Sequence, residues 1–215
     1  MNRFGLIAPG EYYHVYNRGV GKKILFHSKP DYTRFLFLIL YFQSPITFPQ
    51  VGRYVDEFVK HPMLDNMQEI INKRSVEVVS FCIMPNHFHL TLKEEKEGGI
   101  ALYMQRILNA YAKYYNTKYE NSGHVFQGAY KLVHIDNEGQ LRHLSAYIHK
   151  NPREISEWRD KYEEYPWSSY QDFIEDNRFG KLLVPDIMMG EFGKNDYKEF
   201  VRTSLAKLIE GEIVV

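Results

Sequence analysis

The stretch that most constrains the fold is Val76 to Lys93, which reads VEVVSFCIMPNHFHLTLK. Two runs rich in Val, Phe, Ile and Leu are joined by a Met-Pro-Asn step, and a Pro-Asn pair interrupts a strand and favours a turn. We therefore predict a β-hairpin with strands at 76–83 and 87–93 and a turn at 84–86. Its composition indicates a half-buried sheet with one face on a core and one polar face.

Two histidines follow the predicted turn. His87 and His89 are two residues apart, so in a strand they project from the same face with Cα atoms about 6.5–7 Å apart. Imidazoles at that spacing can bind one metal ion, while Phe88, Leu90 and Leu92 face a core on the other side. Two solvated histidines on a polar face give the same pattern, so the spacing alone leaves both interpretations open.

Composition limits the class of protein. The chain has 215 residues, of which 44% are hydrophobic and 15% aromatic, enough for one domain with a substantial core. Cys82 is the single cysteine and lies in an apolar strand, so we expect a core residue in a reducing, cytoplasmic environment. We recognise no signal peptide and no apolar run long enough to span a membrane, and therefore expect a soluble protein.

The net charge is zero, but the charges are unevenly distributed. Residues 1–40 carry six Lys and Arg against two Asp and Glu, and residues 101–153 carry seven against three. Residues 154–215 carry eight against fourteen. Basic blocks indicate an anionic partner such as nucleic acid, although charges that merely solvate different faces give the same pattern. We interpret residues 1–153 as the core and 154–215 as an acidic cap continuous with it, in one domain.

Periodicity predicts the other elements. Strands are expected at 11–18 and 124–135, and helices at 31–43, 65–74, 100–119, 137–150 and 195–209. Asp31 is expected to cap the first of these helices. The pattern predicts an α+β fold with a central antiparallel sheet of four or five strands, helices mainly on one face and the histidines on the other face or its edge. Residues 44–75 suggest no function.

A loop rich in glycine and cations follows the first predicted strand. Arg18, Lys22 and Lys23 accompany Gly19 and Gly21 there, a composition that suits phosphate contact through backbone N–H groups and cationic side chains. An ordinary basic hairpin loop has the same composition, so this segment alone does not decide between them.

The helix predicted at 137–150 adds a second set of polar residues. Tyr147 and Asn151 are four residues apart and therefore lie one turn apart on one helical face. From there a phenol and an amide oxygen could meet the two histidines across the sheet. Water or phosphate would complete such a metal site, an open arrangement that suits Mg²⁺ or Mn²⁺ acting on a phosphoryl group. A Tyr on a helix is more often a packing residue, and the chain has 17 Tyr.

Several segments together resemble the HUH single-tyrosine transposases, specifically the REP-associated tyrosine transposases and their insertion-sequence relatives. The segments are YYHVYNRG at 12–19, FCIMPNHFHLTL at 81–92, YAKYYNTKY ending the helix at 119, GHVFQGAYK at 123–131, LSAYIHKNP at 144–152 and YPWSSY at 165–170. The combination of M-P-N-H-x-H with Y-I-x-x-N-P is more specific than either half. Together the segments span most of the chain.

The resemblance implies a ferredoxin-like core and a role for each residue of the constellation. His87 and His89 would be metal ligands, Tyr147 the nucleophile and Asn151 the polar residue near the metal, where insertion-sequence relatives commonly have Gln. Asn is shorter than Gln, so ligation by Asn151 is less firmly implied than ligation by the histidines. The expected cofactor is a divalent metal, Mg²⁺ or Mn²⁺.

The activity implied is that of a metal-dependent transposase or endonuclease. It would cleave and rejoin single-stranded DNA at hairpin-forming sequences through a 5′-phosphotyrosine intermediate. Candidate DNA contacts are Arg18, Lys22, Lys23, Gln127, Tyr130 and Lys131. Relatives include monomers and homodimers that exchange the Tyr helix, so both states stay open.

Two alternatives come from other functional classes. A metal-dependent hydrolase of a small substrate would be favoured by a closed pocket and a third His or carboxylate ligand. A non-catalytic protein that binds single-stranded DNA hairpins would show binding without nicking.

Overall fold

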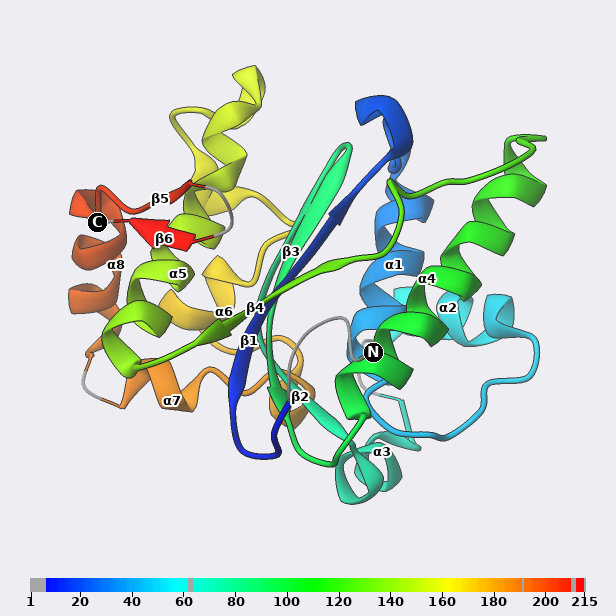
Figure 1. The fold of residues 1–215 in the computed structure, drawn as a ribbon, viewed down its shortest axis with the longest axis horizontal. Helices are drawn as coiled ribbons and strands as arrows, with labels where there is room; N and C mark the ends of the chain where they lie inside the picture. Colours follow the sequence, from blue (N-terminus) through cyan, green and yellow to red (C-terminus); the bar gives the residue numbers. More distant parts are fainter. Residues whose placement is uncertain (1–6, 62–63, 191, 210–211, 215) are drawn as a thin grey trace.

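The fold is built on a four-stranded antiparallel sheet with strand order β2-β3-β1-β4 (Figure 1). A computed structural model describes residues 7–61, 64–190, 192–209 and 212–214. The strands of the sheet are β1 (Tyr12–Arg18), β2 (Val76–Met84), β3 (His87–Glu94) and β4 (Lys131–Ile135). The helices α1 (Lys29–Tyr41) and α4 (Gly99–Lys118) connect β1 to β2 and β3 to β4. This β-α-β-β-α-β order is that of a ferredoxin-like fold, so the predicted α+β class and antiparallel sheet are confirmed.

The central hairpin forms where the sequence predicts it. β2 and β3 pair in antiparallel register with Met84 opposite His87, and the turn between them consists of Pro85 and Asn86. Proline lacks the N–H that a ladder needs, so β2 ends immediately before it. Every residue of β2 is buried, which shows that both faces of the sheet are covered.

α1 and α4 cover one face and form the larger of two hydrophobic clusters. Phe35 of α1 packs against Phe88 of β3 and Tyr111 of α4, with ring centroids 5.0 Å apart in each pair. The prediction that Asp31 caps α1 is wrong, because Ser28 is the N-cap and Asp31 is the third helical residue. The two form a capping box in which the Asp31 carboxylate accepts the Ser28 N–H at 2.8 Å.

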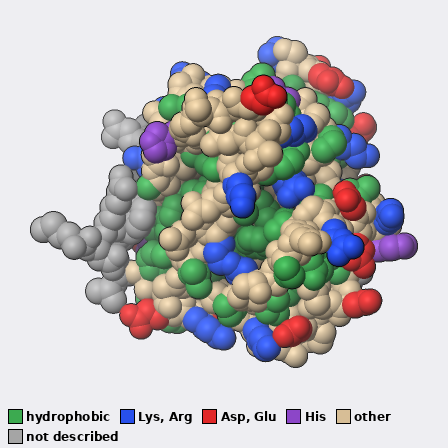
Figure 2. All heavy atoms as spheres, turned by 90° about the vertical axis from the view of Figure 1, so that its right-hand side faces the viewer, with side chains coloured by type: hydrophobic (Ala, Val, Ile, Leu, Met, Phe, Trp, Pro, Cys, Tyr) green, Lys and Arg blue, Asp and Glu red, His purple; other side chains and the backbone are tan. Residues whose placement is uncertain are grey.

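Residues 44–75 enlarge this helical layer. They contain α2 (Val51–Lys60) and α3 (Met67–Lys73), the second of which confirms the helix predicted at 65–74. Phe48 and Phe58 pack on Phe37 of α1, with ring centroids 5.5 and 5.8 Å apart. Figure 2 shows this side of the molecule, where an apolar hollow is surrounded by Lys and Arg side chains.

A second helical layer covers the opposite face of the sheet (Figure 1). Its elements are α5 (Glu138–Lys150), α6 (Tyr170–Ile174), α7 (Asp186–Met189) and α8 (Lys194–Thr203). α5 contacts β2, β3 and β4, and its apolar residues join the C-terminal segment in the smaller hydrophobic cluster. The prediction of helices mainly on one face therefore fits α1 and α4, while α5 and the C-terminal segment bury the other face.

Short 3₁₀ helices occupy several connections. They are Val20–Lys22, Asn151–Glu154, Ser156–Trp158, Tyr162–Glu164 and Gly180–Leu182. Within the described ranges, none of the helices combines the length and the apolar character needed to cross a membrane.

Two predicted elements are shorter than expected. The strand predicted at 124–135 is regular only in β4, because Gly128 adopts a φ of 68° that interrupts extended pairing. The helix predicted at 195–209 ends with α8, and β5 (Lys207–Ile209) follows and pairs with β6 (Glu212–Val214). Lys150 Nζ donates to the carbonyl groups of Arg202 and Ser204, which satisfies acceptors at the end of α8 and favours its termination there.

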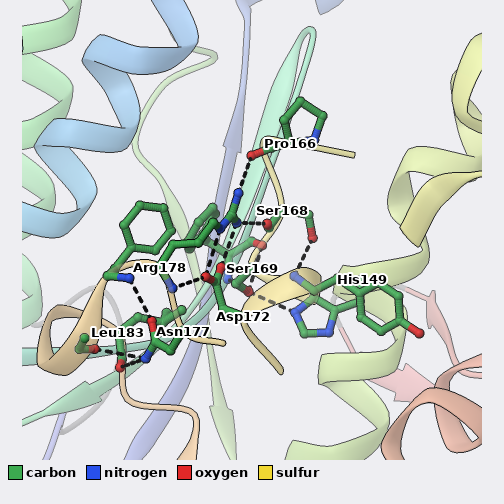
Figure 3. Close-up of polar contacts among 12 residues, drawn as sticks. His149, Pro166, Ser168, Ser169, Asp172, Asn177, Arg178 and Leu183 are labelled. Atoms are coloured by element: carbon green, nitrogen blue, oxygen red, sulfur yellow. Dashed lines mark hydrogen bonds and ion pairs between the residues drawn. The ribbon is translucent and has the colours of Figure 1, made fainter. Parts of the chain in front are cut away.

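The segment 165–184 closes the free edge of β2. Ser169 N donates to the carbonyl of Phe81 at 3.0 Å, and Phe81 N donates back to Ser169 Oγ at 2.9 Å. Arg178 supports the segment by donating to both carboxylate oxygens of Asp172 at 2.9 and 2.7 Å (Figure 3). The covered edge cannot pair with another chain.

Candidate active site

A pocket of about 600 Å³ lies between the sheet and α5. The predicted catalytic and metal-binding side chains His87, His89 and Tyr147 line it. The predicted DNA contacts that also line it are Arg18, Lys22, Gln127 and Lys131. The fold therefore brings residues from β1, the loop after β1, β3, β4 and α5 to one place.

β3 places the two histidine rings side by side. Their centroids are 5.1 Å apart and the ring planes are nearly perpendicular, at 89°. Asn86 Oδ1 lies 2.7 Å from His87 Nδ1 and can accept its proton, which leaves a lone pair on His87 Nε2. That nitrogen lies 3.4 Å from Asn151 Oδ1. A ring nitrogen lone pair and an amide oxygen then face the same spot, as ligands of one cation do.

His14 of β1 lies behind His89 and was not predicted as a site residue. Its Nε2 is 2.9 Å from His89 Nδ1, and the two rings stack at 14°. Burial lowers the pKa of His14 to about 3, so the ring is neutral and can accept the Nδ1 proton of His89. His89 Nε2 is then left unprotonated on the side of Tyr147. Among the described residues His14 Nδ1 has no hydrogen-bond partner, an uncommon condition for a buried polar atom.

α5 carries the predicted nucleophile to the histidines. Its N-terminus is fixed by Asn137, whose side chain accepts the N–H of Gln140. The Tyr147 ring meets the His89 ring edge to face, with centroids 5.4 Å apart. Asn151 Nδ2 donates to the carbonyl of Tyr147 at 2.9 Å, which orients its Oδ1 toward the histidines.

The electrostatic environment keeps the Tyr147 phenol protonated and the histidines neutral. Burial raises the pKa of Tyr147 to about 12, with an opposing effect from its hydrogen bond to Asn151 and a further increase from Glu154. Burial also lowers the pKa of His87, and lowers that of His89 well below its usual value. Neutral imidazoles are the form that binds a metal, and the phenol needs a nearby cation or base before it can react.

The C-terminal segment of the same chain holds α5 in position. His149 is fully buried, with Nδ1 2.7 Å from Tyr197 Oη and Nε2 2.9 Å from Ser169 Oγ. Figure 3 shows His149 reaching Ser169, which in turn bonds the backbone of β2. These bonds place Tyr147 against the histidines of its own chain.

Two of the predicted DNA contacts lie away from the pocket. Lys23 donates to Asn121 Oδ1 at 3.2 Å, and its ammonium is 5.3 Å from the ring centroid of Tyr115. Tyr130 packs against the larger hydrophobic cluster on the other side of the sheet. Of the residues that do line the pocket, Arg18 Nε donates to Gln127 Oε1 at 2.6 Å.

The donor set fits a divalent metal with an open coordination sphere. His87, His89 and Asn151 offer two nitrogen atoms and one oxygen atom, and the pocket leaves room for water or phosphate. In the part of the chain that is described, no three or more His, Cys, Asp or Glu side chains gather in a way that could hold a metal. The third ligand of that kind, which would favour a small-substrate hydrolase, is thus not found there.

Comparisons with known proteins agree with this geometry. A family model described as "Transposase IS200 like" matches residues 52–151, a range that contains both histidines, Tyr147 and Asn151. A solved structure of a REP-associated tyrosine transposase bound to a REP hairpin aligns with a TM-score of 0.52. It is 13% identical, and the alignment covers 87% of this chain and 92% of that chain. No curated protein matches.

The structural alignment shows the shared fold, and the family model locates the motif segment within it. Both point to the family suggested by the M-P-N-H-x-H and Y-I-x-x-N-P segments. The chain belongs to the HUH single-tyrosine transposase family, which includes the IS200-like transposases.

Proposed function

We propose that this protein is a metal-dependent transposase or endonuclease that cleaves and rejoins single-stranded DNA through a 5′-phosphotyrosine intermediate. The observation that carries the proposal is the convergence of Tyr147, His87, His89 and Asn151 in one pocket with cations at its rim. A hairpin is the proposed form of the DNA, because a protein of the same fold binds a REP hairpin.

The covalent step is a displacement at phosphorus. Tyr147 Oη attacks the scissile phosphate and loses its proton, the bond from phosphorus to the 3′ oxygen breaks, and that oxygen leaves as a 3′-hydroxyl after taking up a proton. The 5′ phosphate stays on Tyr147 as a phosphodiester. Attack by a 3′-hydroxyl on this link reverses the step and frees the phenol, so rejoining needs no ATP.

The residues of the pocket divide the remaining tasks. A divalent ion held by His87, His89 and Asn151 would supply positive charge beside the scissile phosphate. Arg18 and Lys22 contact flanking phosphates, whose positions fix the register of the strand.

Aromatic side chains offer a surface for unpaired bases. Tyr16 lines the pocket next to His89, with ring centroids 5.6 Å apart. A base turned out of the stack can lie against such a ring, whatever its sequence.

Loss of the Tyr147 hydroxyl tests the proposal directly. Purified protein is incubated with a single-stranded hairpin oligonucleotide and Mn²⁺, and an SDS-resistant protein–DNA complex is scored on a gel. We expect the complex with the wild type and none with Tyr147→Phe, while hairpin affinity changes by less than about twofold, because a phosphate-dominated interface does not depend on one hydroxyl.

Tyr16→Phe is the matched control, since it removes a phenol from the same pocket. It should keep the complex. A complex that persists in Tyr147→Phe would assign the attack to another tyrosine. Hairpin binding by a wild type that never forms the complex would identify a protein that only binds DNA.

A further inference from the structure

A second cavity lies on the opposite side of the sheet from Tyr147. It has a volume of about 830 Å³ and is bounded by α1, α2 and α4. We call it the α1–α2–α4 groove. Leu38, Phe48 and Ala110 give it an apolar lining, and Figure 2 shows the hollow with basic side chains around it.

Cations outnumber carboxylates in the groove. Arg34, Arg53, Lys113 and Lys118 line it, against Asp56 alone. Lys118 is paired with Asp31 at 2.6 Å. Among the described residues Arg34, Arg53 and Lys113 form no ion pair, so their charges are available to a ligand. Like charges around a concave surface repel one another and raise the local concentration of anions.

An aromatic ring stands among these cations. The Arg34 guanidinium lies over the Tyr114 ring, with its central carbon 4.3 Å from the ring centroid. Tyr114 is also held in place by its hydroxyl, which donates to Asp31 Oδ1 at 2.8 Å. A fixed aromatic surface, unpaired cations and an apolar lining are the components with which proteins bind single-stranded nucleic acid.

Cations also connect the groove to the pocket of Tyr147. Lys22 lines that pocket, and the next residue, Lys23, reaches Asn121 just beyond the end of α4. In the last turn of α4, Lys118 lines the groove and donates to Ser28 at the start of α1. A polyanion that leaves the pocket along the loop after β1 therefore meets positive charge up to the groove.

We propose that the α1–α2–α4 groove binds a single-stranded DNA segment that flanks the hairpin cleaved by Tyr147. Its phosphates contact Arg34, Arg53 and Lys113, and its bases lie against Tyr114 and the apolar lining. Duplex DNA has a persistence length of about 50 nm and cannot bend round the edge of one domain, whereas a single strand can. The proposal rests on the proposed function, which supplies the DNA.

The groove also gives a role to the segment 44–75. α2 contributes Val51, Gly52 and Arg53 to one wall, and the loop before it contributes Phe48. Without α2, residues Arg34 and Lys113 would lie on an open helical surface. The segment thus converts a surface between two helices into a groove that can hold a strand.

The test compares a hairpin with and without an oligothymidine tail, using fluorescence anisotropy on the full chain. We expect the tail to raise wild-type affinity about tenfold, a modest value for stacking plus phosphate contacts. The triple variant Arg34→Gln, Arg53→Gln, Lys113→Gln should lose this gain. For the tailed hairpin, the slope of log affinity against log salt should fall by about 2, since each single-strand phosphate contact contributes about 0.7.

The matched control removes three exposed cations that line neither cavity, Lys60→Gln, Lys96→Gln and Lys181→Gln. It should keep the tail-dependent gain at an equal loss of net charge. Equal thermal midpoints for the two triple variants would show that the groove variant is folded. A photoreactive thymidine in the tail should crosslink to a peptide containing Tyr114.

Each remaining outcome is decisive. A wild type that forms the Tyr147 complex but gains no affinity from the tail overturns the groove and leaves the proposed function intact. A wild type that neither binds nor nicks the hairpin removes both. A polyglutamate peptide that binds the wild type, is lost in the groove variant and leaves tail binding unchanged would assign the groove to an acidic protein.

Discussion

The two faces of the central sheet bury different chemistry. On the α1–α4 face the contacts join aromatic and aliphatic side chains, as in the group of Phe35, Phe88 and Tyr111. On the α5 face, polar side chains are buried, and His89 and Asn151 are only 4% and 3% exposed. The same sheet thus has an apolar core on one side and a hydrogen-bonded polar layer on the other.

This difference separates stability from chemistry. An apolar contact contributes through burial alone, whereas a buried hydrogen bond contributes only about 1 kcal/mol net and loses more when one partner is left unsatisfied. The polar layer under α5 therefore orients side chains more than it stabilises the fold. Substitutions on the α1–α4 face should lower the free energy of unfolding, and those on the α5 face should lower reactivity or metal binding.

Removing both histidines should have the largest effect on reactivity. For His87→Ala with His89→Ala we expect the rate of DNA–protein complex formation to fall on the order of a thousandfold, since loss of several kcal/mol of charge stabilisation corresponds to that factor. Titration calorimetry should show that Mn²⁺ binding is lost. A variant that still binds Mn²⁺ as the wild type does would place the metal elsewhere.

The opposite face should respond to a large-to-small substitution. Phe35→Ala should lower the free energy of unfolding by about 3–4 kcal/mol, because it leaves a cavity among packed rings. Urea denaturation measures the change. The folded variant should still form the complex near the wild-type rate at low temperature. A rate that falls as far as in the double His variant would show that the two faces are not separable.

Local periodicity explains what the sequence could predict. The hairpin at 76–94 and the helices α1, α4 and α5 follow apolar patterns and turn residues that act over a few positions. Gly128 illustrates the limit, because nothing in the run 124–135 announces a positive φ in the middle of an apolar segment.

The meeting of Tyr147 with His89 could not be predicted from spacing. The two residues are on separate elements, and only the resemblance to a family paired them before the fold was known. The direction of Lys23 was equally hidden, since it depends on Asn121, 98 positions away. The signal for His14 was present but unread: it is two residues before Tyr16, on the same face of a predicted strand.

Lowering the pH should weaken the attachment of α5. Burial lowers the pKa of His149 to about 3, so the native state holds it neutral while the unfolded chain takes up a proton below about 6.5. Its contribution is complete above that pH and is lost as the pH falls toward 3, by about 1.4 kcal/mol per pH unit. Between pH 6.5 and 5, His149 should therefore lower the free energy of unfolding by about 2 kcal/mol.

The variant His149→Gln isolates this contribution. Urea denaturation at the two pH values should show a decrease smaller than that of the wild type by about 2 kcal/mol. His124→Gln removes an exposed histidine and should keep the wild-type decrease. Equal decreases in all three proteins would mean that His149 is protonated in the folded state.

The smallest expected effect concerns His14, which touches a proposed metal ligand without lining the pocket. His14→Phe keeps a ring in the stack with His89 but removes the nitrogen that lies 2.9 Å from His89 Nδ1. We expect the dissociation constant for Mn²⁺, measured by calorimetry, to rise about tenfold, as is common for partners of ligating histidines. Complex formation should recover at saturating Mn²⁺, because the ligands themselves remain.

Affinity and rate together define the role of His14. A residue that merely fills space would change the urea midpoint without changing Mn²⁺ affinity. His14→Gln, which restores a polar side chain, should recover part of the affinity that His14→Phe loses. If both variants bind Mn²⁺ as the wild type does, the unpartnered Nδ1 of His14 is a defect of packing, and the polar layer under α5 is less organised for metal binding than its geometry indicates.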